Sequence, residues 1–190
     1  LSRDAGLANT TLSRYLAILE ALYLLEPLRP WSANLTTRLA RSPKLYLSDS
    51  GLTAYLTGAT EERAARQPEI AGPLLEAFVL GEVRRQASWN EGQPSVWFLR
   101  THKGDEVDIV LEQRDGRVAG IEVKAAARID RHDTRGLAFL RDRLGERFAR
   151  GVVLYSGQQT LPAGDRLWAM PIDALWRWES VQISHAVGEI

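Results

Sequence analysis

A short stretch in the second half of the chain constrains the fold most, because it holds two apolar runs separated by a turn. The runs cover residues 106–111 and 118–125, and each has the length and the apolar content of a β-strand. Asp115 and Gly116 lie between them, and this dipeptide is typical of the tight turn of a β-hairpin. The pattern therefore predicts a hairpin around which any sheet in this part of the chain must be built.

Three charged residues on this hairpin indicate chemistry. Glu122 and Lys124 are two residues apart, so on a strand their side chains project from the same face. Asp108 lies between apolar neighbours on the preceding strand, where a buried carboxylate is costly without a partner. Two carboxylates and a lysine that converge at strand ends can hold Mg²⁺ and activate water against a phosphodiester. The alternative is an ordinary cross-strand ion pair on a solvated face.

Composition excludes several other classes of protein. The 190 residues are 45% hydrophobic and carry no net charge, so nucleic-acid contact must come from local patches rather than from a basic chain. The chain has no cysteine, which excludes disulfides, cysteine-based zinc sites and thiol chemistry. A signal peptide and a membrane-spanning apolar run are also missing. We therefore expect a cytoplasmic globular protein of one large or two small domains that does not enter a membrane.

The first part of the chain, residues 1–58, has the pattern of a winged helix. A turn at residues 5–7 is followed by apolar residues at helical spacing over residues 11–25. Two strand-like pieces, residues 22–28 and 44–47, can form the wing, and a short helix is expected directly after them. This unit looks truncated at its N-terminus, and the polar residues 59–69 are predicted to be a linker.

The second part of the chain, residues 70–190, has an α-β-β-β-α-β order. The predicted elements are a helix over 73–86, strands over 95–101, 106–111 and 118–125, a helix over 133–148 and a strand over 151–155. A strand over 166–170 and a short helix over 172–178 follow. The expected class is therefore α/β (α+β), with a mixed sheet flanked by helices.

This order, together with Asp108 and the Glu122-x-Lys124 pair, resembles the PD-(D/E)XK superfamily of restriction-endonuclease-like nucleases. The resemblance implies that Asp108 and Glu122 ligate Mg²⁺ or Mn²⁺ and that the Val123 carbonyl adds a ligand. It implies that Lys124 orients or helps to deprotonate the attacking water. Members of the superfamily often add a glutamate from the first helix, and Glu76 fits that place.

A second resemblance spans nearly the whole chain. The run from Ser42 to Leu52, together with Glu76-Ala77-Phe78-Val79 and the motifs above, is similar to the C-terminal region of prokaryotic AAA-type ATPases. The resemblance implies a P-loop module upstream of this chain, and the non-methionine Leu1 agrees with a C-terminal fragment. The phosphate-binding loop G-x-x-x-x-G-K-[ST] does not occur here. ATP is therefore expected only in that missing module, and no ATPase activity is expected from this fragment.

Two functions remain open at this stage. The first is Mg²⁺-dependent cleavage of DNA phosphodiesters; the second is a non-catalytic module, with the same fold, that binds or couples DNA or protein partners of the ATPase. Residues 59–190 hold 18 basic and 20 acidic side chains, and this balance favours the second function, because nucleases that grip duplex DNA present a basic groove. Thr11, Arg14 and Arg100 are the candidate nucleic-acid contacts, and a homo-oligomer is possible. A regulatory protein-interaction role has no specific support.

Overall fold

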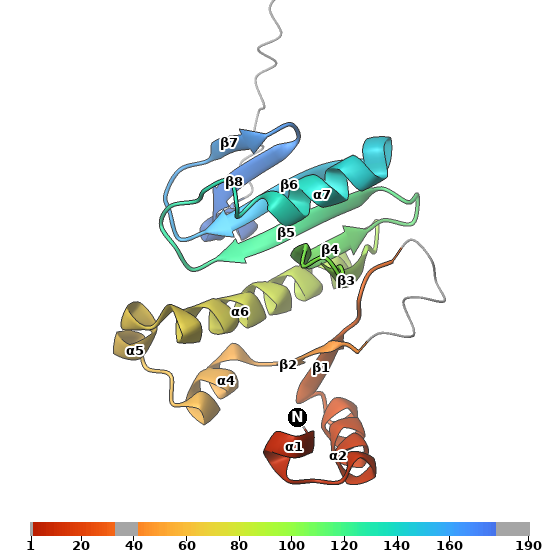
Figure 1. Ribbon diagram of the computed structural model, residues 1–190, viewed down its shortest axis with the longest axis vertical. Coiled ribbons are helices and arrows are strands. Elements are labelled where there is room, and N and C mark those ends of the chain that lie inside the picture. The colour runs from red at the N-terminus through yellow and green to blue at the C-terminus, as the bar shows by residue number, and fades with distance from the viewer. Residues whose placement is uncertain (1, 33–41, 178–190) are drawn as a thin grey trace, which may run out of the picture.

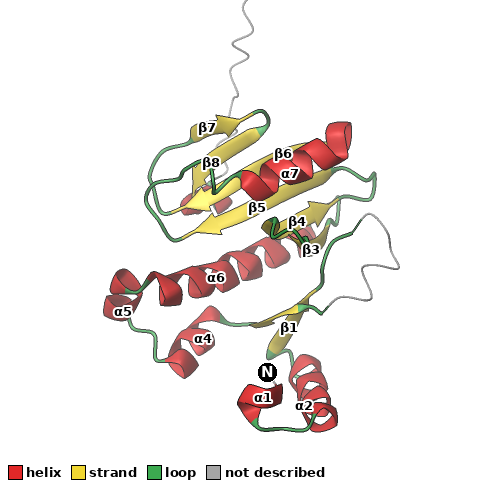
Figure 2. Ribbon diagram, viewed as in Figure 1, coloured by secondary structure: helices red, strands yellow, loops and turns green. Residues whose placement is uncertain are grey.

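The structure is a computed structural model that describes residues 2–32 and 42–177. It has a mixed α/β fold, in which helices cover both faces of a six-stranded sheet (Figure 1, Figure 2). In chain order its elements are α1 (Ser2–Ala5), α2 (Asn9–Ala21), β1 (Leu25–Leu28), β2 (Lys44–Leu47), α4 (Ser50–Thr57), α5 (Glu61–Arg66), α6 (Pro68–Trp89), β3 (Ser95–Arg100), β4 (Glu106–Glu112), β5 (Val118–Lys124), α7 (Arg135–Leu144), η1 (Gly145–Arg147), β6 (Phe148–Tyr155), β7 (Leu161–Gly164), β8 (Leu167–Pro171) and η2 (Ile172–Leu175).

The large sheet has the strand order β3-β4-β5-β6-β8-β7. Strands β3, β4 and β5 are antiparallel, β5, β6 and β8 are parallel, and β7 runs antiparallel to β8. The predicted hairpin is present, because β4 and β5 pair antiparallel on either side of a turn in which Gly116 has a φ of +83°, a value that favours glycine. The succession α6-β3-β4-β5-α7-β6 has the α-β-β-β-α-β order expected from the sequence. The mixed α/β class is confirmed.

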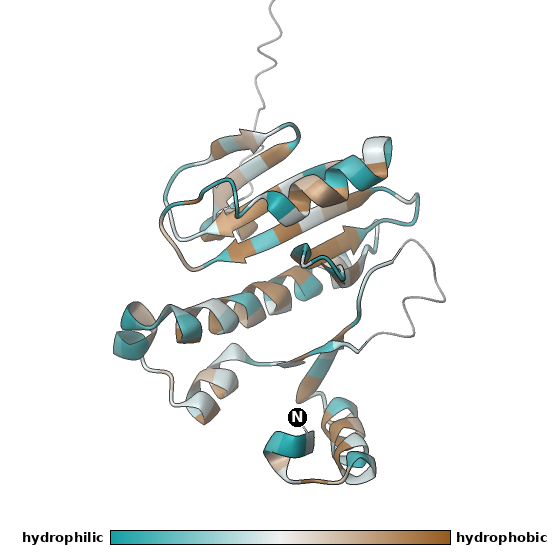
Figure 3. Ribbon diagram, viewed as in Figure 1, coloured by the Kyte–Doolittle hydropathy of each residue, from teal (hydrophilic) through white to brown (hydrophobic). Residues whose placement is uncertain are grey.

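Each face of the sheet has its own hydrophobic core. The core beneath α7 includes Val107, Val110, Leu137 and Leu140. The core beneath α6 includes Val79, Leu80, Val83 and Ile109. Figure 3 shows hydrophobic residues along the strands that separate these two cores. Helix α7 lies so close to β4 that a Cβ atom on Gly136 would be 1.7 Å from the Glu106 carbonyl oxygen, so only glycine permits this approach.

The N-terminal segment is bound to the large sheet by backbone hydrogen bonds. Strands β1 and β2 form a two-stranded antiparallel sheet, and β1 brings Leu28 into the core beneath α6. The chain then runs beside β3, where the Trp31 N–H donates to the Phe98 carbonyl at 2.6 Å and the Phe98 N–H donates to the Arg29 carbonyl at 3.1 Å. The β1–β2 hairpin therefore packs against the same layer that contains the candidate site.

Several boundaries differ from the expected ones for local reasons. Strand β1 begins at Leu25 rather than at residue 22, because Tyr23 adopts a left-handed conformation with a φ of +57°. The expected linker contains helix α5, whose first turn is capped by the Thr60 side chain. Helix α6 begins earlier than expected, with Pro68 at its first turn. Strand β7 was not predicted. Among the described residues, no helix is both long and apolar enough to span a membrane.

Candidate functional site

A β-bulge in β4 positions Asp108. Opposite Phe98 of β3, strand β4 has one extra residue, so that Asp108 and Ile109 share a single partner position. Bulges redirect side chains and are frequent beside functional sites. Regular pairing of β4 with β5 ends where Ile109 stands opposite Ile121. Asp108 therefore lies where these two strands separate.

The Asp108 carboxylate makes a hydrogen bond to β5 beyond the point where regular backbone pairing of β4 with β5 ends. Its Oδ2 accepts the backbone N–H of Val123 at 3.0 Å, and its Oδ1 lies 3.4 Å from the Nζ of Lys44. Only 12% of the side chain is exposed. Burial raises the pKa of Asp108, and the nearby Glu76 carboxylate raises it further. Asp108 is thus a buried acid that one amide and one ammonium group stabilise in its charged form.

Glu122 and Lys124 form the first of two ion-pair groups beside Asp108. The Nζ of Lys124 lies 3.0 Å from Oε1 of Glu122 and 3.8 Å from Oδ1 of Asp133. Burial and the charge of Asp108 raise the pKa of Glu122 to about 7. The second carboxylate oxygen, Oε2, is buried and has no hydrogen-bond partner among the described residues. One oxygen of this carboxyl group therefore pairs with Lys124, and the other has no partner among the described residues.

Lys44 of β2 is the centre of the second group. Its Nζ lies 2.8 Å from Oε1 of Glu76 and 2.8 Å from Oε1 of Glu106, in addition to its contact with Asp108. The Tyr46 hydroxyl donates to the same Glu76 oxygen. Burial lowers the pKa of Lys44, but the hydrogen bonds to Glu106 and Glu76 more than offset this, so the pKa is above its usual value. The group is a charged lysine enclosed by three carboxylates.

Arg100 extends the second group towards the surface. Its guanidinium makes two hydrogen bonds to Glu106, at 3.1 and 2.7 Å. The Phe98 ring has both cations near it, with Lys44 at 5.4 Å and Arg100 at 6.0 Å from the ring centroid. A continuous series of ionic contacts therefore runs from Asp108 through Lys44 and Glu106 to the exposed Arg100.

The structure brings together six of the eight sequence-predicted site residues and places the other two, Thr11 and Arg14, on a separate helix. Asp108, Glu122, Lys124 and Glu76 interact with one another directly or through Lys44. Val123 contributes its N–H to Asp108. Arg100 reaches the edge of the same cluster. Thr11 and Arg14 lie on α2, with the Arg14 guanidinium 5.7 Å from the centroid of the Tyr15 ring.

Sequence reasoning missed Lys44, Tyr46 and Glu106. A signal was present, because the chain has only three lysines and two of them, Lys44 and Lys124, lie at this site. Lys44 and Tyr46 are also two residues apart on a strand, so that both project from one face. Their common target, Glu76, is on a different element 30 or more residues away. Only the folded chain shows that contact.

The atoms near Asp108 that could ligate a metal ion are carboxylate oxygens. Within residues 2–32 and 42–177, no three His, Cys, Asp or Glu side chains are arranged to hold a metal ion by themselves. The charge of Asp108 nevertheless raises the pKa of Glu122, and the buried Oε2 of Glu122 has no hydrogen-bond partner among the described residues. Two hard oxygen donors with one unpartnered atom suit Mg²⁺, which completes its shell with water and phosphate oxygens.

Comparison with known proteins places the chain in a family. Residues 71–175, more than half of the chain, match the family model described as Domain of unknown function (DUF4143). The chain belongs to this family. Residues 1–63 match a second model, described as Domain of unknown function (DUF8612). The DUF4143 segment contains Glu76, Asp108, Glu122 and Lys124, whereas Lys44 and Tyr46 come from the other matched segment. The site therefore combines residues of both.

Two curated relatives cover almost the whole chain. An uncharacterised protein of Mycobacterium tuberculosis and one of Mycobacterium bovis are each 31% identical over 183 residues. The aligned region is 95% of this chain and 39% of each relative. The chain thus spans about two fifths of the length of the curated relatives that it matches.

Proposed function

We propose that this DUF4143 chain carries a Mg²⁺-dependent centre that hydrolyses DNA phosphodiesters. One observation supports the proposal most: Asp108 and the Glu122–Lys124 pair meet where β4 and β5 separate, and a buried oxygen of Glu122 has no partner among the described residues. A carboxylate pair with an adjacent ammonium is the set of groups that metal-assisted phosphodiester hydrolysis requires.

Asp108, Glu122 and the Val123 carbonyl are the groups that would hold the metal. Mg²⁺, when bound, supplies Lewis-acid stabilisation of the charge on the scissile phosphate. Mn²⁺ has the same preference for oxygen ligands. With a pKa of about 7, the Glu122 carboxyl group can hold or release a proton near neutral pH.

Lys124 is suited to orienting water and stabilising negative charge rather than to removing a proton. Burial lowers the pKa of Lys124, but the Glu122 carboxylate and the charges of Asp108 and Asp133 raise it above its usual value. An ammonium held 3.0 Å from Glu122 donates hydrogen bonds in a defined direction. Glu76 has an indirect role in this scheme, because it pairs with Lys44 and Lys44 in turn contacts Asp108.

The element order and the site together support a PD-(D/E)XK-like domain preceded by a winged-helix unit. We place both in the C-terminal part of a prokaryotic AAA-type ATPase, whose P-loop module lies outside this chain. The short span of the chain relative to its curated relatives agrees with a longer protein. Coupling of DNA cleavage to that ATPase, and assembly as a homo-oligomer, are parts of the same proposal.

A second function of another class is favoured by Lys44. Its ammonium occupies Asp108 Oδ1 and two further carboxylates, so one side of the candidate centre is already neutralised by the chain itself. A non-catalytic module that binds or couples partners of the ATPase would have this arrangement without any metal. The two functions make different predictions for the variants below.

A cleavage assay decides between the two. Purified wild-type chain is incubated with single-stranded, duplex and branched DNA in Mg²⁺, in Mn²⁺ and in EDTA. The nuclease proposal expects metal-dependent products that Lys124→Ala reduces about 10²- to 10⁴-fold, whereas Arg117→Ala, at the far end of β5, cleaves normally. Wild type that cuts none of these DNAs, or an undiminished Lys124→Ala, would leave the coupling module as the function.

A further inference from the structure

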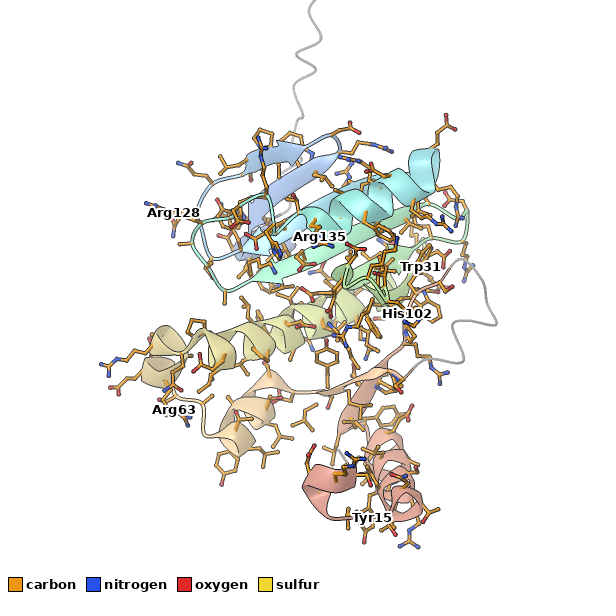
Figure 4. All side chains as sticks on the ribbon, in the orientation of Figure 1. Tyr15, Trp31, Arg63, His102, Arg128 and Arg135 are labelled. Atoms are coloured by element: carbon orange, nitrogen blue, oxygen red, sulfur yellow. The ribbon has the colours of Figure 1, made fainter. Side chains whose placement is uncertain are left out.

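A cavity lies on the α7 side of the sheet, beside the β3–β4 turn. Its volume is about 740 Å³, which is in the range of ligand-binding clefts. It is formed by the β3–β4 turn, the last turn of α7 and the chain after β1, and it is lined by Trp31, Ser32, Leu99, Arg100, Thr101, His102, Lys103, Asp105, Phe139, Arg143, Leu144 and Arg147. Figure 4 shows Trp31 and His102 together on one side of the molecule.

The rim of this cavity is cationic although the whole chain has no net charge. Lys103 and Arg143 are exposed, and neither makes an ion pair with another described residue. Arg147 is also exposed, but its guanidinium donates to the Gly116 carbonyl at 3.0 Å and lies 3.4 Å from Glu112. Asp105, the single acidic residue of the lining, already pairs with Arg135 at 3.1 Å. The rim therefore has positive charge available for an anion.

The floor of the cavity is apolar and partly aromatic. Leu99 and Trp31 belong to the core beneath α7. Phe139 and Leu144 pack against that core from α7, and both are only half-buried. A cationic rim above an apolar floor matches a ligand that has a flat apolar part and a negative backbone, as each nucleotide of a single strand has.

We infer that this cavity, here called the Arg143 cleft, binds single-stranded nucleic acid. One base enters the cleft against Phe139, and the flanking phosphates contact Lys103 and Arg143. A duplex can place a base in a concave site only after that base is unstacked and unpaired, and this cost favours a single strand. An acidic peptide would satisfy the rim but would leave the apolar floor unfilled. Only the cleavage of the bound strand rests on the proposed function, because binding itself requires no metal.

The cleft is connected to the candidate centre by Arg100. This residue lines the cleft and also pairs with Glu106 at 2.7 Å, and Glu106 contacts Lys44 beside Asp108. A strand held by the Arg143 cleft therefore passes along the ionic series that leads to Asp108. In the nuclease proposal, this selects single-stranded or frayed DNA as the substrate class.

The test is fluorescence anisotropy with a labelled oligo(dT) of about 12 nucleotides, a length typical of single-strand binding sites. EDTA is present, so that hydrolysis cannot interfere. The Lys103→Glu/Arg143→Glu chain should lose affinity about tenfold, and the slope of log K against log salt should fall by about 1.4, which is two phosphate contacts of about 0.7 each. A matched control is Arg63→Glu/Arg66→Glu on α5, which changes the charge equally and should bind within about twofold of wild type.

Phe139→Ala separates the apolar contribution from the charge. It should lower the affinity about tenfold and leave the salt slope unchanged, provided that circular dichroism shows a folded chain. Equal losses in the cleft and α5 variants, tighter binding of duplex, or equal binding of polyglutamate would each overturn the inference. Binding is measured in EDTA, so its outcome does not depend on cleavage. Failure of cleavage with intact binding therefore refutes the nuclease proposal alone.

Discussion

The two lysines beside Asp108 make an instructive comparison. Lys124 and its partner Glu122 come from one strand and are two residues apart, and one oxygen of Glu122 has no partner among the described residues. Lys44 joins carboxylates from α6 and β4 to a strand of the N-terminal hairpin, and all of its contacts are within the protein. The first group thus keeps one buried carboxylate oxygen without a partner among the described residues, while the second links the two matched segments.

The largest expected effect is on stability, from loss of Lys44. Lys44→Met keeps the length of the side chain but leaves Glu76 and Asp108 without their shared cation, whereas Glu106 keeps its pair with Arg100. Removal of one partner from such a buried group typically costs about 3–5 kcal/mol. Urea denaturation followed by circular dichroism should show a loss of this order.

A double variant makes this prediction sharper. Glu76→Gln in the Lys44→Met background removes one of the uncompensated charges, and the coupling between the two changes should be about 1–3 kcal/mol. Strictly additive losses would show that Lys44 and Glu76 do not act as one group.

The next effect is a dependence of stability on pH that comes from Glu122. Its pKa rises from 4.5 in the unfolded chain to about 7 in the folded protein, so the folded state binds this proton more tightly. The free energy of unfolding should therefore fall as pH rises from about 4.5 to about 7, by about 2–3 kcal/mol in total. Glu122→Gln cannot titrate, and its stability relative to wild type should increase over this interval. Parallel curves for the two proteins would contradict the shift.

A smaller stability effect is expected for Lys124. About a third of its side chain is exposed, and Glu122 can take up a proton once the ammonium is gone. Lys124→Met should therefore cost only about 1 kcal/mol, although the nuclease proposal expects it to reduce cleavage strongly. A thermal melt in which Lys124→Met is as unstable as Lys44→Met would contradict the predicted difference in stability between the two lysine groups.

The smallest effect is expected at the outer end of the ionic series. Arg100 is more than half exposed, and exposed ion pairs contribute less than about 1 kcal/mol. Arg100→Gln should therefore shift the urea midpoint only slightly, as should Arg117→Gln at the equally exposed Asp115 pair. A loss at Arg100 that approaches the one at Lys44 would mean that the two cations form a single cooperative unit.

Much of the fold was predictable because its signals are local. Two apolar runs and the Asp115-Gly116 turn predicted β4, β5 and their hairpin to within one residue at every end. Predicted boundaries were wrong where a single left-handed residue ends an element, as at Tyr23. They were also wrong where a capping side chain stabilises a helix of polar residues, as in α5. The Glu122–Lys124 contact was predictable for the same reason, since strand geometry alone places i and i+2 on one face.

The hairpin, the α-β-β-β-α-β order and the pair on β5 could therefore be predicted from local patterns, because each depends on neighbours in the chain. Only the folded chain shows that Lys44 contacts Asp108, because the two residues are 64 positions apart and neither local pattern predicts the contact. The bulge at Asp108 and the Arg143 cleft also belong to this second class. Both depend on how β4 is paired and covered, and pairing over long distances is set by the packing of the whole sheet.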